Sequence, residues 1–114
     1  MKEKRNCQMY FDDILTSIER IFEYTQGLDF AGFKRDYKTV DAVIRNFEIL
    51  GEAAKNIPDS IKERYPDVPW DEMYYLRNRI SHAYFGIDYE IIWDIITNYL
   101  FENKIQIEKI SKEI

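Results

Sequence analysis

The residues best suited to chemistry lie together at positions 77–84, with the sequence RNRISHAY. They include His82, the only histidine of the chain, and two arginines. Histidine exchanges a proton near neutral pH, and the fork of donors on arginine suits a phosphate group. These groups are the minimum needed to cleave an RNA phosphodiester without a metal ion. A lone histidine on a helix is more often a surface or core residue, so this stretch alone favours a structural role.

Length and composition indicate one globular domain, residues 1–114. The chain has 114 residues, of which 46% are hydrophobic and 32% charged, enough to bury a core. The single cysteine, Cys7, excludes an intramolecular disulfide and a cysteine-based zinc site. No apolar run is long enough to cross a membrane, and residues 1–5 lead into no apolar signal core. We therefore expect a cytoplasmic protein.

The charge balance limits the kind of partner. A net charge of −5 and a pI of about 4.9 argue against a general nucleic-acid coat, which depends on many neutralised phosphates. They leave room for an enzyme that concentrates a few cations in one cleft, and for a basic partner protein. One histidine, scattered carboxylates and four distant glycines predict no metal site, no phosphate-binding loop and no cofactor.

Hydrophobic periodicity predicts helices throughout. The first helix spans residues 8–26 and ends at Gly27; a connection with one short helical turn occupies 28–36. The second helix spans 37–57 and ends before Pro58, and Asp59 is expected to cap a short turn. Side chains at steps of three and four form the core stripes of both helices: Tyr10, Phe11, Ile14, Leu15, Ile18, Ile21, Phe22, Val40, Val43, Ile44, Phe47, Leu50, Ala54 and Ile57.

Pro69 opens a third helix that carries residues 77–84 at its C-terminal end. Its expected core face comprises Trp70, Met73, Leu76 and Ile80. Gly86 ends it, and Asp88 is the predicted N-cap of a last continuous helix to the C-terminus. That helix has a heptad seam with one polar position, Asn103, able to pack inside the domain or against a second copy: Tyr89, Trp93, Ile96, Leu100, Asn103, Ile107, Ile110 and Ile114. The pattern predicts an all-α, up-down bundle of four principal helices joined by short turns. On the second helix, Arg45, Glu48 and Glu52 are spaced to form a surface ion-pair ladder.

The central stretch resembles a known motif. Arg77-Asn78, followed by His82 and Tyr84, is similar to the Arg-x4-His-x-Tyr motif of the HEPN superfamily. More narrowly, the chain resembles the HEPN-type ribonuclease toxin of two-gene HEPN/MNT toxin–antitoxin systems. The likeness covers nearly the whole chain, including residues 51–54, the Pro69-Trp70 pair and residues 82–93.

This resemblance implies a homodimer with the motif helix at the interface, acting as a metal-independent endoribonuclease. Arg77 and His82 would be catalytic and Asn78 would support them. The implied partner is an MNT-type nucleotidyltransferase antitoxin, which in some systems transfers AMP to the tyrosine that corresponds to Tyr84. The RNA substrate would be transfer or messenger RNA.

The residues themselves add a constraint. Cleavage by the 2′-hydroxyl needs a general base, a general acid and charge stabilisation at the phosphate. A monomer has one histidine, so a two-fold dimer would supply the second imidazole. Arg79 is either an RNA contact or a solvated surface residue, and Tyr84 and Tyr74 either stack on a base or belong to the core. Two alternatives stay open: a non-catalytic HEPN module that binds nucleotide or RNA, and a structural partner subunit of a nucleotidyltransferase.

Overall fold

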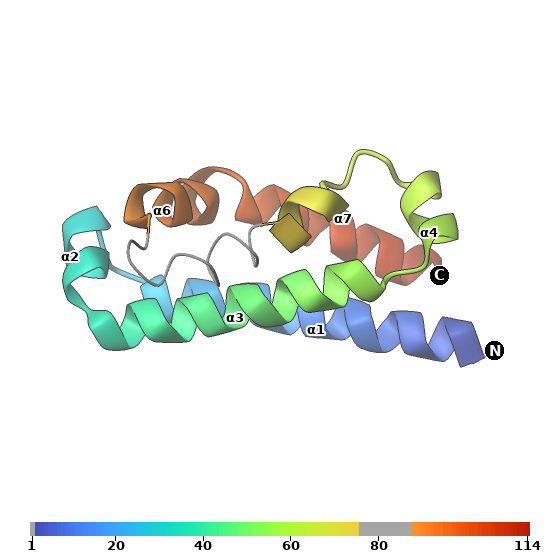
Figure 1. The fold of residues 1–114 in the computed structure, drawn as a ribbon, viewed down its shortest axis with the longest axis horizontal. Coiled ribbons are helices and arrows are strands. Elements are labelled where there is room, and N and C mark those ends of the chain that lie inside the picture. The colour runs from blue at the N-terminus through green and yellow to red at the C-terminus, as the bar shows by residue number, and fades with distance from the viewer. Residues whose placement is uncertain (1, 76–87) are drawn as a thin grey trace.

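A computed structural model describes residues 2–75 and 88–114 (Figure 1). No strand occurs in these two segments, so the predicted all-α class is confirmed. Residues 70–75 are also helical and begin the third principal helix. The bounded helices are α1 (Lys2–Thr25), α2 (Phe30–Arg35), α3 (Tyr37–Asn56), α4 (Asp59–Arg64), α6 (Tyr89–Asn98) and α7 (Leu100–Glu113).

Helices α1 and α3 form the long antiparallel pair on which the rest of the bundle packs (Figure 1). Their predicted apolar stripes are buried against each other, with Phe11, Ile14, Val43 and Phe47 almost completely inaccessible. Gly27 adopts a φ of 79°, the left-handed conformation that ends α1 as predicted. Burial of one face of each helix therefore determines the register of this pair.

Short polar side chains begin the helices. Asp29 caps α2 by accepting a 2.7 Å hydrogen bond from the backbone N–H of Gly32. Asp36 caps α3 by accepting from the N–H and the hydroxyl of Thr39, which lowers the pKa of Asp36. The cap predicted at Asp59 is wrong, because Pro58 occupies the N-cap position of α4 without a side-chain hydrogen bond.

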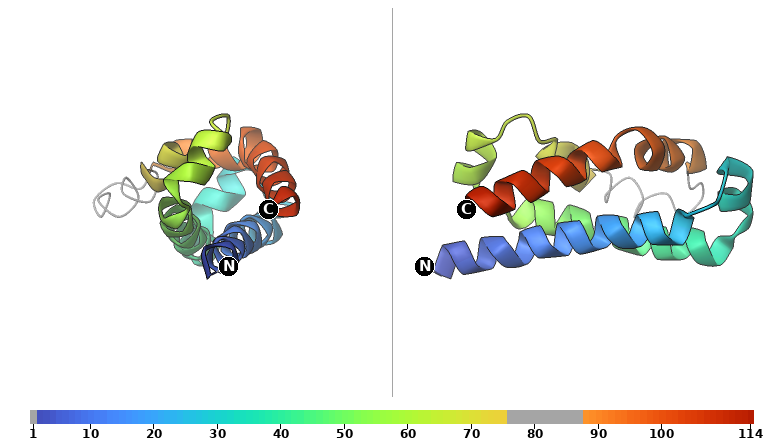
Figure 2. Two further views of the ribbon diagram at one scale, coloured as in Figure 1. Left: turned by 90° about the vertical axis from the view of Figure 1, so that its right-hand side faces the viewer. Right: turned by 180° about the vertical axis from the view of Figure 1, so that it is seen from behind.

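The prediction of one continuous last helix is also wrong. The chain leaves helical geometry at Tyr99, with φ −124° and ψ −32°, and this residue separates α6 from α7. No proline or glycine lies there, but Thr97 and Asn98 before the break are weak helix formers, and the Thr97 hydroxyl donates to the Trp93 carbonyl at 2.8 Å, a contact that bends helices. Tertiary packing favours the same break. Helix α6 contacts α2, where the Trp93 ring lies 5.1 Å from that of Phe33, whereas α7 contacts α1. Because these supports lie in different directions, a single straight helix could not pack on both (Figure 2).

The predicted seam packs inside the chain. Ile96, Leu100, Ile107 and Ile110 are buried, and Tyr89 and Trp93 are half-buried beside α2. Helix α7 returns along α1, which brings both ends of the chain to the same end of the bundle (Figures 1 and 2).

Polar contacts join distant segments near those ends. The amide of Gln8 donates to Ser111 Oγ at 2.7 Å, and the Tyr65 hydroxyl donates to Glu113 at 2.7 Å, which raises the pKa of Tyr65. Arg45 and Glu48 lie 3.7 Å apart on the surface of α3, which confirms the first pair of the predicted ladder.

Candidate functional site

The motif residues predicted from the sequence lie outside the described residues. This holds for all five site residues, so their roles stay predictions: Arg77, Asn78, Arg79, His82 and Tyr84. Leu76 and Ile80, expected in the core, also lie in that stretch. The structure describes the two segments that hold the motif at its ends, and the surfaces beside them.

The segment before the motif is firmly anchored. Trp70 is buried, and its indole N–H donates to the carbonyl of Tyr65 at 3.0 Å. Met73 is also buried, and its N–H donates to the carbonyl of Pro69 at 3.0 Å in the first helical turn. Proline and the aromatic core residue thus fix where the third helix starts and which face it buries, as the sequence predicts.

Two tyrosines end this described segment. The Lys55 ammonium lies 5.0 Å from the centroid of the half-buried Tyr74 ring, so one face of that ring is occupied by a cation. The neighbouring Tyr75 is 60% exposed, with its ring centroid 6.1 Å from that of Tyr74. Of these two tyrosines, Tyr75 is therefore the more accessible for stacking on a base, although the sequence analysis did not select it.

The segment after the motif begins at a well-formed helix cap. Asp88 Oδ1 accepts a 3.1 Å hydrogen bond from the N–H of Ile91, which confirms the predicted N-cap of α6. Ile92 is buried one turn later. The motif is thus held between two helices, each anchored in the same core.

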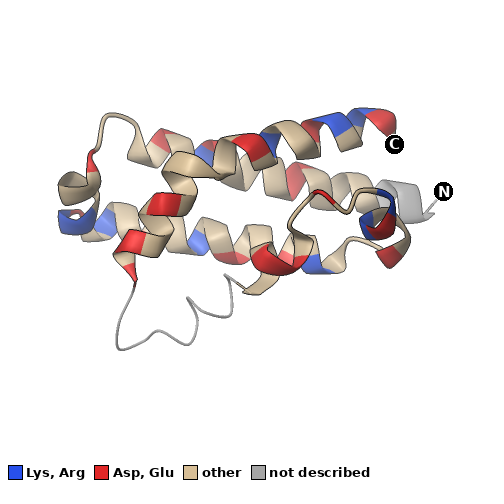
Figure 3. Ribbon diagram, turned by 90° about the horizontal axis from the view of Figure 1, so that it is seen from above, with Lys and Arg blue, Asp and Glu red and all other residues tan. Residues whose placement is uncertain are grey.

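The described surfaces on both sides of the motif carry negative charge (Figure 3). Exposed carboxylates belong to the helical segment before it and to the start of α6: Asp71, Glu72, Asp88, Glu90 and Asp94. In the sequence, Arg77 and Arg79 are the only Lys or Arg residues between Arg64 and Lys104. These carboxylates repel phosphate, so binding of an RNA backbone here would depend on cations such as the two arginines of the motif and Lys55 beside Tyr74.

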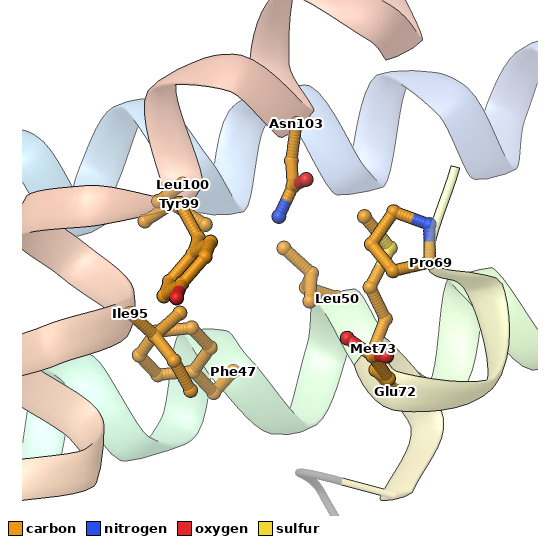
Figure 4. A pocket seen from close by; sticks show the side chains of 9 residues that line it. All are labelled: Phe47, Leu50, Pro69, Glu72, Met73, Ile95, Tyr99, Leu100 and Asn103. Atoms are coloured by element: carbon orange, nitrogen blue, oxygen red, sulfur yellow. The ribbon is translucent and has the colours of Figure 1, made fainter. Parts of the chain in front are cut away.

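A pocket of about 180 Å³ lies beside the segment that leads into the motif (Figure 4). It opens between α3, residues 69–73 and the α6–α7 junction, and its walls are mainly apolar. Tyr99, Asn103 and Glu72 supply its polar atoms. The only sequence signal for this pocket is Asn103, the single polar position in an otherwise apolar seam.

We also searched the described residues for a metal-binding cluster and for a membrane-spanning helix. No group of three or more His, Cys, Asp or Glu side chains in segments 7–75 and 88–114 is arranged to hold a metal ion. No helix in those segments is both long and apolar enough to span a bilayer.

Comparison with known protein families now bears on this arrangement. The family described as Ribonuclease HepT-like matches residues 14–110, which is most of the chain. The chain belongs to the HepT-like ribonuclease family. This family lies within the HEPN superfamily, so the superfamily resemblance of the motif is confirmed.

Individual relatives of HepT-like type match over nearly the full length. "Putative RNase MJ0127" of Methanocaldococcus jannaschii is 43% identical over 111 residues, or 97% of this chain and 92% of that protein. "Probable ribonuclease HepT" of Thermococcus cleftensis is 42% identical over 109 residues, covering 96% and 99%. "Putative RNase TTE0752" of Caldanaerobacter subterraneus is 37% identical over 104 residues, covering 91% and 93%. No solved structure matches the chain significantly.

The HepT-like match includes both the motif and the pocket. Residues 77–84 and Asn103 all fall within the matched range 14–110. Any function proposed for the motif therefore concerns the family domain itself, not an appended segment.

Proposed function

We propose that the protein is a metal-independent endoribonuclease in which Arg77 and His82 are the catalytic residues. One observation carries the proposal: a HepT-like ribonuclease chain contains Arg77, His82 and Tyr84 in the order and spacing of the Arg-x4-His-x-Tyr motif. His82 is also the only side chain of the protein with an ordinary pKa near neutrality.

The chemistry is an internal transfer at phosphorus. A neutral His82 imidazole takes the proton of the RNA 2′-hydroxyl, whose oxygen forms a bond to the neighbouring phosphorus. The bond from phosphorus to the 5′-oxygen breaks, and a protonated imidazole gives its proton to that oxygen. The products are a 2′,3′-cyclic phosphate and a 5′-hydroxyl. Arg77 stabilises the charge that builds on the phosphate oxygens, and Asn78 supports these two residues.

This scheme needs two imidazoles, whereas the chain has one. A two-fold homodimer with the motif helices at its interface supplies the second His82 and doubles the arginines in the shared cleft. Arg79 is then available to bind the RNA backbone. Transfer RNA and messenger RNA are the proposed substrates, in the cytoplasm.

The proposed biological role is the toxin of a toxin–antitoxin pair. Its partner would be an MNT-type nucleotidyltransferase that silences the enzyme by attaching AMP to Tyr84. The added phosphate carries about one negative charge and would pair with Arg77 or Arg79, in the place meant for the RNA backbone. The adenine would add bulk to the same cleft.

The test compares wild-type protein with His82→Ala on total RNA and on a labelled oligoribonucleotide. We expect His82→Ala to lose at least about 100-fold in cleavage rate, the usual contribution of a general acid–base, while its helical circular dichroism and RNA binding persist. Undiminished cleavage by His82→Ala would refute the proposed role of the histidine. RNA binding without cleavage by the wild type would instead favour a non-catalytic binding module.

A further inference from the structure

The pocket beside residues 69–73 has the form of a slot (Figure 4). The ring of Tyr99 and the Pro69 ring lie on opposite sides of it, and Leu50 forms its floor. The remaining apolar walls come from α3, the third helix and the α6–α7 junction: Phe47, Met73, Ile95 and Leu100.

Two groups at this slot have unused capacity for interaction. Figure 4 shows the side-chain amide of Asn103 pointing into the space between Tyr99 and Pro69. Within the described residues, neither this amide nor the Tyr99 hydroxyl forms a hydrogen bond. Tyr99 is 54% exposed although it lies at the mouth of an apolar cavity. An unpaired amide and an open aromatic face are the groups that recognise a flat, polar-edged ring.

The size of the cavity limits what can enter. Pockets for drug-sized ligands measure about 300–1,000 Å³, whereas this one measures about 180 Å³. An apolar cavity of about 150 Å³ can hold a benzene ring. The slot is therefore suited to one planar ring system, with any attached sugar and phosphate left outside.

We propose that this pocket binds one unpaired nucleobase of the RNA substrate, with Tyr99 stacking on the base and Asn103 hydrogen-bonding to its edge. The inference rests on the proposed ribonuclease function and adds a specificity-determining site to it. Bases splayed out of single-stranded RNA are recognised by aromatic stacking and by hydrogen bonds to their edges. The Glu72 carboxylate, also at the pocket, accepts a hydrogen bond from an exocyclic amino group, so bases that have one, such as adenine and cytosine, bind better than uracil.

Chain connectivity places this pocket within reach of the proposed chemistry. Met73 lines the pocket and precedes Arg77 by four residues, so their Cα atoms lie within about 15 Å of each other in any conformation. A base held here would therefore belong to the same RNA strand as the phosphate that Arg77 binds, a few nucleotides away at most.

Base binding can be measured without any cleavage. Uniformly 15N-labelled protein is titrated with AMP, CMP, UMP and ribose 5-phosphate, and the side-chain amide resonances of Asn103 are followed by NMR. These resonances are assigned by their loss in Asn103→Asp. We expect saturable shifts with AMP and CMP, weaker binding of UMP, and no shift with ribose 5-phosphate. Equal shifts with ribose 5-phosphate, or none with any nucleotide, would overturn the proposal.

Substitutions at the rim of the pocket test whether Tyr99 stacks on the base or only supports the fold. Tyr99→Ala should weaken CMP binding roughly tenfold, in the range found for loss of a stacked aromatic, and Tyr99→Phe should retain it. Tyr37→Ala is the matched control, because Tyr37 is 70% exposed and lies outside the pocket. Glu72→Gln should reduce the preference for CMP over UMP. Equal CMP affinity in Tyr99→Ala and wild type would contradict the stacking role.

The outcomes distinguish this inference from the proposed function. If CMP shifts the Asn103 amide resonances but the protein cleaves no RNA, the base pocket is supported and the ribonuclease proposal is refuted. If the protein cleaves RNA but no nucleotide shifts the Asn103 amide resonances, the ribonuclease proposal is supported and the base pocket is refuted.

Discussion

His82 restricts the chemistry more than any other residue, because the chain has no second imidazole and, in its described part, no metal-binding cluster. If the general acid and the general base are both imidazoles, they must therefore come from two copies of the chain. The charge around the motif also affects how a phosphate can bind there. Carboxylates flank the described ends of the motif, so the phosphate charge there has to be offset by the motif's own cations, Arg77 and Arg79, and by neighbours such as Lys55 beside Tyr74.

Tyr84 provides the first prediction at the residue scale. If its hydroxyl accepts AMP, Tyr84→Phe keeps most of the RNase activity but gains no mass when incubated with the cognate nucleotidyltransferase and ATP. Intact-protein mass spectrometry measures the change, and Tyr75→Phe, which removes the hydroxyl of an exposed tyrosine outside the motif, is the control that should still be modified. An AMP-sized gain on Tyr84→Phe, or no gain on the wild type, would remove Tyr84 from the mechanism.

At the scale of elements, helix α7 buries one face in the core and exposes the other. Ile107 is fully buried on the inner face of α7, whereas Ile105, two residues earlier, is 51% exposed. Ile107→Ala should therefore lower the free energy of unfolding by about 2–5 kcal/mol, the cost of emptying a core site. Ile105→Ala should change it by no more than about 0.5 kcal/mol. Urea denaturation measures both, and similar losses for the two variants would contradict this orientation of α7.

The cap of α3 gives a prediction with a defined pH dependence. Thr39 holds the folded-state pKa of Asp36 below its usual value. Asp36 therefore contributes stability that is present above its unfolded-state pKa of about 3.9 and is lost as the pH falls through the lower folded-state pKa. Asp36→Asn keeps a good capping side chain that does not titrate. We expect the melting temperature of wild type to exceed that of Asp36→Asn more at pH 7 than at pH 3; an equal difference at both would contradict the role of the charge.

Local sequence accounts for most of these elements. The stripes of α1 and α3, the left-handed Gly27 and the Asp88 cap are all determined by residues close in the chain, so they could be predicted. The break at Tyr99 could not, because it also depends on where α1 and α2 lie, and Thr97 and Asn98 before it are weak helix formers that alone do not end a helix.

The candidate site divides in the same way. The motif is defined by the spacing of its residues along the chain, so these residues could be selected from the sequence alone. The base pocket gathers Phe47, Met73, Tyr99 and Asn103 from separate elements, so only the fold brings them together. The choice between Tyr74 and Tyr75 likewise depends on Lys55, which is distant in sequence but lies over the Tyr74 ring.

At the scale of the whole molecule, a composite site can be tested by mixing inactive chains. A dimer of Arg77→Ala chains has no Arg77 in the shared cleft and a dimer of His82→Ala chains has no His82, but a mixed dimer has one of each. After random exchange half of the dimers are mixed, and each of these has one imidazole in the cleft where the wild type has two, so only part of the wild-type activity should return. RNA cleavage after co-refolding measures this. No recovery, with wild-type activity eluting as a monomer on size exclusion, would contradict the shared cleft.

The central claim, cleavage by His82 and Arg77 without a metal, is tested most directly by the ends of the RNA fragments. Wild-type protein is incubated with a labelled oligoribonucleotide in excess chelator, and the fragment ends are identified by mass spectrometry. We predict undiminished cleavage that leaves 2′,3′-cyclic phosphate and 5′-hydroxyl ends, because the 2′-oxygen is the nucleophile. Cleavage that stops in chelator and returns with added divalent metal, or that leaves 3′-hydroxyl and 5′-phosphate ends, would contradict the account.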